Sequence, residues 1–214
     1  MALRFWDPVP IACSGDIATI DSAKGIRAAL EMLHLHVELT ILSEWPEYSR
    51  FFRGERSPSD FLILDCHGGR NGLIFPITRK NAAGDIERNE HCLQAADVGQ
   101  MRAGDPAGAI LALSCVAATS GHAGLFRNSG FKYYIAHNGC LLEDAKLLYP
   151  LTFFAHLRAG DRDSQPQNFS ILEAHEAACR VLPMENATRG FQIFEIPHDV
   201  SPTATLQGKP SGAA

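Results

Sequence analysis

Short apolar segments alternate along the chain with segments of helical periodicity. Continuous or alternating apolar runs predict strands at 9–15, 36–42, 60–66, 108–115, 132–139 and 190–196. Apolar residues spaced three and four apart predict helices over 22–34, 44–54, 87–101, 143–158 and 169–182, with a shorter helix at 123–130. This order of elements favours an α/β fold with a mostly parallel central sheet of about six strands and helices on both faces.

Capping and turn residues refine two of these elements. We expect Asp21 or Ser22 to cap the helix over 22–34, because Asp and Ser side chains accept hydrogen bonds from the first helical N–H groups. The segment "GLIFPIT" (72–78) is expected to form an edge strand or a hairpin, because Pro76 has no N–H to give to a central strand.

Length and composition limit the possible functions. The 214 residues suffice for one domain over 1–200, and the polar, Pro/Gly-rich stretch 201–214 is expected to be disordered. A net charge of −5 offers no basic face for nucleic acid, and no apolar run reaches the roughly 18 residues of a membrane span. The N-terminal segment has Asp7 and two prolines where a signal peptide needs an apolar core, so we expect a cytoplasmic protein.

Two of the buried runs end on residues that carry chemistry. "FLIL" (61–64) leads to His67, and "AILAL" (109–113) leads to Cys115. Functional groups of an open parallel sheet collect beyond the carboxyl ends of its strands, so these two side chains share one edge if their strands are neighbours. A thiol with an ordinary pKa of about 8.5 needs a base near neutral pH, and an imidazole with a pKa of about 6.5 suits that role.

Donors for an oxyanion are available in the same segments. Gly68 lacks a Cβ, so its N–H can approach a substrate closely, and the N–H of Cys115 can be a second donor. His122 follows soon after Cys115 and is the alternative base if His67 points away. Cys66 adjoins His67, but alternation along a strand sends its side chain to the opposite face, where we expect it to pack.

The remaining cysteines leave a metal site open as an alternative. The cysteines are spread through apolar segments, which is typical of free thiols in a reducing cytoplasm: Cys13, Cys66, Cys92, Cys115, Cys140 and Cys179. Two Cys and two His at one sheet edge would also satisfy zinc, and the set that meets this condition is His67, Cys115, His137 and Cys140.

The two strand ends resemble the caspase-like cysteine peptidases (clan CD), which carry a strand followed by His-Gly and, about 50 residues later, a strand followed by Cys. The caspase motif Gln-Ala-Cys-x-Gly is absent, and "LSCVAATSG" (113–121) is more similar to the CHAT and separase-related branch. The stretch "YYIAHNGCLLEDAKLLYPLTFFAHLRAG" (133–160) also resembles the CHAT pattern, although His137-Asn138-Gly139 stands where a Trp is usual.

This resemblance implies a caspase-like three-layer sandwich and an endopeptidase that works through a thioester. Cys115 would be the nucleophile, His67 the base, and the N–H groups of Gly68 and Cys115 the oxyanion donors. Asp144 stands at the acid of the CHAT loop and Asp16 follows the first strand, so either can bind a basic side chain of the substrate.

The partners implied are a protein or peptide substrate and a regulatory protein or small-molecule activator, with no cofactor. Analogy with bacterial CHAT peptidases adds a role in antiviral defence. Two other functions remain open. Because the usual Trp is missing, the first alternative is a caspase-like pseudoenzyme or binding module. The second alternative is another thiol hydrolase with a similar sheet, such as an amidase.

Overall fold

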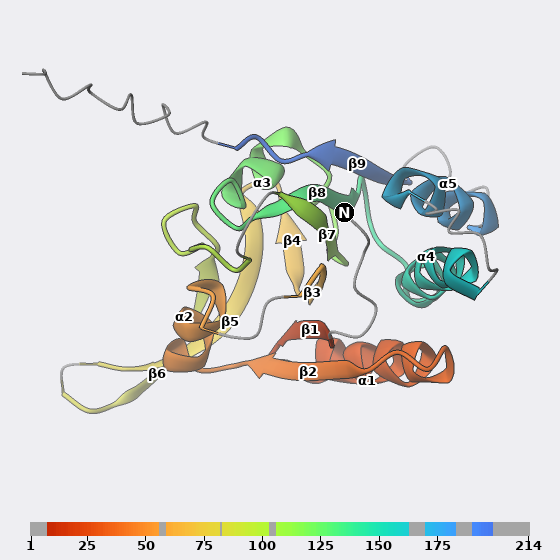
Figure 1. Cartoon of the computed structure of the whole chain (residues 1–214). Helices are drawn as coiled ribbons and strands as arrows, with labels where there is room; N and C mark the ends of the chain where they lie inside the picture. The colour runs from red at the N-terminus through yellow and green to blue at the C-terminus, as the bar shows by residue number, and fades with distance from the viewer. Residues whose placement is uncertain are drawn as a thin grey trace, which may run out of the picture.

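The computed structural model describes residues 8–55, 59–81, 83–102, 106–162, 170–182 and 190–198 (Figure 1). The stretch 201–214, for which the sequence predicts disorder, lies outside the described residues. Among the described helices, none combines the length and the apolar character that a bilayer crossing needs.

A six-stranded sheet forms the centre of the protein. Its strands are β1 (Val9–Ser14), β2 (Val37–Leu42), β3 (Phe61–Asp65), β7 (Ala107–Ala112), β8 (Phe131–His137) and β9 (Phe191–Glu195). Their order is β2-β1-β3-β7-β8-β9, and every neighbouring pair is parallel except β8 and β9. The predicted α/β class and the mostly parallel sheet are therefore confirmed. The two strands that precede His67 and Cys115, β3 and β7, are direct neighbours.

Helices cover both faces of this sheet and make it the middle of three layers (Figure 1). One face carries α1 (Ile17–Met32), α4 (Glu143–Arg162) and α5 (Ile171–Val181). The other carries α2 (Trp45–Phe52), α3 (Ser120–Leu125) and a second, smaller sheet. Successive side chains of a strand point to opposite faces of the sheet, so each buried strand contributes to a core on both faces. In β3, Ile63 packs with the first set of helices, and its neighbours Leu62 and Leu64 pack with the second set of elements.

The smaller sheet contains the one element that the periodicity misassigned. It consists of β4 (His67–Gly69), β5 (Gly72–Lys80) and β6 (Ile86–Cys92), all antiparallel. The helix predicted over 87–101 is wrong, because this region begins with strand β6 and continues as a loop. A tight turn decides the outcome: the Asn81 side chain accepts from the N–H groups of Ala83 and Asp85, and Gly84 has a φ of +90°.

Pro76 lies in the middle strand of the smaller sheet. The predicted hairpin is present as β5 and β6, but β5 is not an edge strand. The pairing of β4 covers only Gly72 to Ile74, so at Pro76 the strand has β6 on one side and no β4 on the other. The missing N–H of proline is therefore tolerated where β5 is locally an edge.

The first helix begins five residues before the predicted start. Its N-cap is Asp16, whose side chain accepts from the N–H of Thr19, and not Asp21 or Ser22. The apolar periodicity marked only the buried part of α1, while the polar first turn lies at the carboxyl end of β1. This correction matters because it places a carboxylate at the edge of the sheet where chemistry was predicted.

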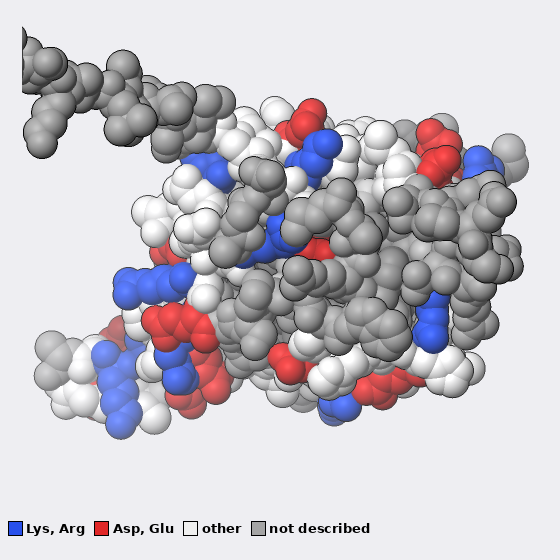
Figure 2. All heavy atoms as spheres, in the orientation of Figure 1, with Lys and Arg blue, Asp and Glu red and all other residues white. Residues whose placement is uncertain are grey.

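Charged side chains of both signs lie next to each other on the face shown in Figure 2. The exposed edge strand β6 carries Glu87, Arg88 and Glu90 in close succession. Charges of this kind discourage a bare strand edge from pairing with another chain. Over the described residues in that view, no single-sign patch suggests a nucleic-acid partner.

Candidate active site

Four strand ends meet at the carboxyl edge of the central sheet. Because β1, β3, β7 and β8 are parallel, the segments that follow them emerge on the same side. These segments are Ser14–Asp16, Cys66–Gly69, Ser114–Val116 and 138–140. The edge thus gathers the carboxylate of Asp16, the imidazole of His67 and the thiols of Cys115 and Cys140 from parts of the chain that are far apart in sequence.

Gly68 is the point where the His67 segment and the Cys115 segment touch. A Cβ built on Gly68 would collide with the carbonyl oxygen of Cys115 and would lie 2.8 Å from the Cβ of Ser114. Only a glycine allows this approach of backbone to backbone. The structure therefore brings the segment that carries the predicted base and the segment that carries the predicted nucleophile into direct backbone contact.

Cys115 receives direct support from the loop that precedes α4. The N–H of Leu141 donates to its Sγ at 3.3 Å, which fixes the position of the sulfur. The side chain is half-buried, so a substrate can reach it. Within the described part of the chain, the N–H of Cys115 itself has no hydrogen-bond acceptor, and it is available to a developing oxyanion.

The turn after Cys115 holds a strained residue. Val116 has a φ of +52°, a left-handed conformation that is rare for a β-branched side chain. Its N–H donates to the carbonyl of Gly139 at 2.7 Å, and the N–H groups of Ala117 and Ala118 both donate to the carbonyl of His137. The end of β8 thereby fixes the Cys115 turn. Strain retained in this way is concentrated at functional sites.

His67 is hydrogen-bonded to the carboxylate of Asp16. Its Nε2 lies 3.1 Å from Oδ2 of Asp16, and the imidazole is largely exposed. Asp16 also accepts from the hydroxyls of Ser14 and Thr19, at 2.6 and 2.8 Å. With Nε2 turned to the carboxylate, Nδ1 is the ring nitrogen left to exchange a proton with a thiol.

The surroundings of Asp16 keep its carboxylate ionised. Partial burial raises the pKa of Asp16, but hydrogen bonds from Ser14 and Thr19 and the positive charge available on His67 outweigh it and lower the pKa well below its usual range. An ionised carboxylate beside Nε2 fixes the orientation of the ring and stabilises the imidazolium. The sequence offered Asp16 as a residue that binds substrate, whereas its geometry fits a group that orients His67.

Lys146 places a positive charge beneath the same edge. Its Nζ forms an ion pair of 3.0 Å with Asp65, which is completely buried at the end of β3. Burial lowers the pKa of Lys146, but the carboxylate of Asp65 outweighs it, and the negative charge of a Cys115 thiolate raises the pKa further. Burial raises the pKa of Asp65.

His122 is a structural link between the two chemical segments. Its Nδ1 lies 2.6 Å from the hydroxyl of Thr119, and the backbone of Gly69 accepts a hydrogen bond from the ring. Burial lowers the pKa of His122, partly offset by Gly69, so the ring is neutral. Both nitrogens are occupied, and the role that fits is to hold β4 against α3. His67, whose ring is largely exposed, remains the base that we consider.

Cys66 packs where alternation predicted. Its side chain is buried among apolar residues on the face opposite His67, and its Sγ lies 3.2 Å from the hydroxyl of Ser114. Burial raises the pKa of Cys66 to about 12, despite the hydrogen bond from Ser114. This thiol is therefore protonated near neutral pH and packs as an apolar side chain.

Asp144, the other predicted substrate-binding residue, lies in the exposed first turn of α4. Its carboxylate accepts from the N–H of Ala145 at 2.8 Å and keeps oxygen lone pairs available to solvent. The structure thus places it after the loop of Cys140 and Leu141, on the segment that supports Cys115. Its proposed contact with substrate stays a prediction.

The four residues considered for zinc do not converge. The His137 ring is buried against Phe191, with the ring centroids 5.2 Å apart. Across the described ranges, no three His, Cys, Asp or Glu side chains are arranged to hold a metal ion. The two sulfurs of Cys115 and Cys140 lie 4.0 Å apart and form a separate pair.

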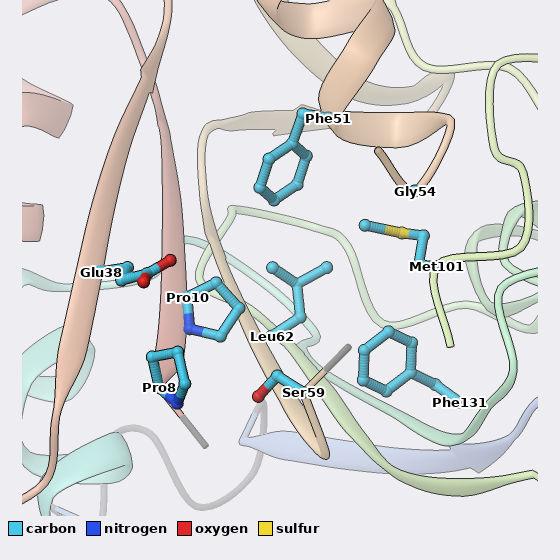
Figure 3. A pocket seen from close by; sticks show the side chains of 9 residues that line it. All are labelled: Pro8, Pro10, Glu38, Phe51, Gly54, Ser59, Leu62, Met101 and Phe131. Atoms are coloured by element: carbon cyan, nitrogen blue, oxygen red, sulfur yellow. The ribbon is translucent and has the colours of Figure 1, made fainter. Parts of the chain in front are cut away.

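An apolar cavity lies at the opposite end of the strands (Figure 3). Residues from β1, β3, β8 and α2 line it, among them Pro10, Phe51, Leu62 and Phe131. It leaves about 30 Å³, room for no more than a water or two. A peptide cannot enter a space of this size, so the amino-end cavity does not compete with the Cys115 edge as a substrate site.

Comparison with known proteins adds no family to this picture. No protein-family model matches the sequence, and no curated protein matches it either. The case for a function therefore depends on the geometry of the carboxyl edge.

Proposed function

We propose that the protein is a caspase-like cysteine endopeptidase in which Cys115 is the nucleophile and His67 the general base. Asp16, ionised and hydrogen-bonded to Nε2 of His67, orients the ring. The substrate is a protein or peptide, and the resemblance to CHAT peptidases suggests a regulatory partner or a small-molecule activator, a cytoplasmic location and a role in antiviral defence. No cofactor takes part in the reaction.

The proposed reaction has two halves. In the first, the Sγ of Cys115 attacks the peptide carbonyl carbon while Nδ1 of His67 takes the thiol proton. The N–H groups of Gly68 and Cys115 stabilise the oxyanion, and the leaving amine receives the proton from His67 as the thioester forms. In the second half, His67 activates a water molecule, which hydrolyses the thioester and releases the acid.

One observation carries this proposal: Gly68 brings the backbone that follows His67 against the backbone of Ser114 and Cys115. The order β3 next to β7 supports the caspase-like arrangement over other thiol hydrolases, because caspase-like enzymes place the His and Cys strands side by side.

Cleavage of a proteome tests the proposal. The purified protein and its Cys115→Ala variant are incubated with a cell extract, and the new N-termini are sequenced. We expect wild type to produce a recurring set of N-termini that Cys115→Ala does not produce, while circular dichroism shows both variants folded. Equal sets from both proteins would refute the peptidase. Substrates that bind Cys115→Ala but stay intact with wild type would indicate a binding module.

A further inference from the structure

Two sulfurs share the active edge. The Sγ of Cys140 lies 4.0 Å from the Sγ of Cys115. Their backbones are held close as well, because Val116 and Gly139, the residues next to them, are joined by an N–H to carbonyl hydrogen bond of 2.7 Å. A disulfide needs sulfurs about 2.05 Å apart, so the remaining gap is of the size that a side-chain rotation at Cys140 can close.

The other four cysteines have different surroundings. Cys13 and Cys66 are buried, and burial raises the pKa of each thiol to about 12. Cys92 donates to the carbonyl of Asn71, and Cys179 lies beside the ring of His175. Cys115 and Cys140 are the only two sulfurs in mutual contact within the described residues.

The environments of the two sulfurs give them different reactivity. Cys115 accepts a hydrogen bond from the N–H of Leu141, and its charge interacts with Lys146. The negative charge on Cys115 raises the pKa of Cys140, which therefore remains a thiol with a proton to give. Cys140 is exposed on the loop before α4, where an oxidant can arrive.

We infer that Cys115 and Cys140 form a reversible disulfide when a hydroperoxide reaches the site. The Cys115 thiolate attacks one peroxide oxygen, the O–O bond breaks, and hydroxide or alkoxide leaves, so Cys115 becomes a sulfenic acid. The Cys140 sulfur then attacks the Cys115 sulfur. The S–O bond breaks, the thiol proton and the hydroxyl leave as water, and the S–S bond forms. The two thiols lose two electrons and the peroxide gains them.

Two consequences follow for the protein. The disulfide occupies the sulfur of Cys115, so an enzyme that uses this sulfur is switched off until a dithiol reduces it. It also protects Cys115 from irreversible oxidation to the sulfinic acid. The disulfide itself does not depend on the proposed peptidase activity, because its formation needs no substrate.

Mass spectrometry after peroxide treatment tests the inference. The full-length protein is treated with a small excess of hydrogen peroxide, free thiols are blocked with N-ethylmaleimide, and the protein is digested with trypsin. Cleavage after Arg102, Arg127, Lys132 and Lys146 puts Cys115 and Cys140 on separate peptides without any other cysteine. We expect a cross-linked pair of these two peptides, at more than ten times the level of any other cysteine pair, and its loss after dithiothreitol.

Two variants control this experiment. Cys140→Ser changes an exposed side chain, and its Cys115 peptide is expected to carry sulfinic acid in place of the cross-link. Cys92→Ser removes a partly exposed cysteine elsewhere and is expected to keep the cross-link in full. Free thiols at both Cys115 and Cys140 after treatment, sulfinic acid at Cys115 in wild type, or cross-links shared among all cysteines would overturn the inference. A cross-link without proteolysis would leave it intact and remove only the peptidase.

Discussion

The two ends of the central sheet use charged groups in opposite ways. At the amino end, Asp60 and Arg102 are both buried and form an ion pair with a shortest distance of 2.6 Å. At the carboxyl end, the His67 side chain is 57% exposed although it faces Asp16, and Cys115 is half-buried. The first pair neutralises itself within the fold, whereas the second set keeps a ring nitrogen and a sulfur available to a ligand.

This difference separates stability from chemistry along the same strands. A buried pair whose charges satisfy each other holds loops together but offers nothing to a substrate. An exposed imidazole that is hydrogen-bonded to an ionised acid still has one ring nitrogen that can exchange a proton. If the comparison is right, substitutions at the amino end change the free energy of unfolding, and substitutions at the carboxyl end change reactivity.

The largest expected effect comes from the amino end. Asp60→Ala leaves the Arg102 guanidinium buried without this carboxylate, and the free energy of unfolding is expected to fall by roughly 3–5 kcal/mol. Urea unfolding followed by circular dichroism measures the change. In molecules that are still folded, the alkylation rate of Cys115 is expected to stay as in wild type. A loss below about 1 kcal/mol, the usual value for an exposed pair, would contradict the contrast.

The next effect concerns the contact between the His67 and Cys115 segments. Gly68→Ala forces a Cβ against the Cys115 carbonyl, so turnover of a substrate found in the proteome experiment is expected to fall about 100-fold. Gly25→Ala is the matched control, because a Cβ there meets nothing within 4 Å. We expect it to keep full activity and to gain roughly 0.5–1 kcal/mol of stability within α1. Equal turnover by the two variants would remove the central contact from the mechanism.

A smaller effect is expected from the residue that orients His67. Asp16→Asn keeps a side chain that caps α1 but removes the charge, so at pH 7 the variant should lack the stability that the ionised carboxylate contributes. Turnover is expected to fall at least tenfold, because an amide cannot stabilise the imidazolium as a carboxylate does. Rates measured under saturating substrate, together with a urea titration, separate the two effects.

The same variant has a distinct pH dependence. Asp16 has a lowered pKa in the folded protein, so its ionised form contributes stability at every pH above the ordinary value of about 3.9. That contribution is lost only as the pH falls from about 4 toward the folded pKa. Wild type should therefore lose stability in acid faster than Asp16→Asn, and the two curves should run parallel above pH 8, where neither the carboxylate nor the adjacent imidazole changes its charge. Curves that stay parallel below pH 4 would contradict the assignment of an ionised Asp16.

The smallest expected effect is at Lys146. Lys146→Met removes a cation that interacts with the charge of Cys115. Alkylation of Cys115 at pH 7 should slow about fivefold, which corresponds to the loss of about 1 kcal/mol of attraction. Lys146→Arg keeps the charge and should react nearly as wild type. If the two variants react alike, the effect comes from packing around Asp65 and not from charge.

The sequence predicted the central sheet because its strands are buried on both faces. A run such as Phe61 to Leu64 contains no polar residue, so it is recognised as a buried strand. The alternation of strands and helices along the chain then predicts that these strands are parallel neighbours in one sheet. The region 87–101 failed for the opposite reason. β6 is an exposed strand with a polar sequence, so it shows no alternation of apolar residues that would predict a strand. Its pairing with β5 is set by the turn at Asn81.

The candidate site was predictable only in part. His67 and Cys115 could be found because each directly follows a buried strand, and the rule of strand ends places both on one edge. The roles of Asp16 and Lys146 depend on where α1 and α4 begin and how they pack, which is a tertiary property. The sequence does show a polar Ser-Gly-Asp segment at the end of β1. Such a segment is as typical of a helix N-cap as of a residue that orients a histidine.

The relative reactivity of two neighbouring cysteines tests the central claim most directly. Cys140 is more exposed than Cys115 but has no base, so it is a built-in reference 4.0 Å away. Brief alkylation with iodoacetamide at pH 6 to 8 in the presence of a reductant, quantified on the two tryptic peptides, gives both rates. The proton exchange proposed here predicts that Cys115 reacts faster than Cys140 in wild type and loses this advantage in His67→Ala. A slower Cys115 in wild type, or an unchanged ratio in His67→Ala, would contradict it.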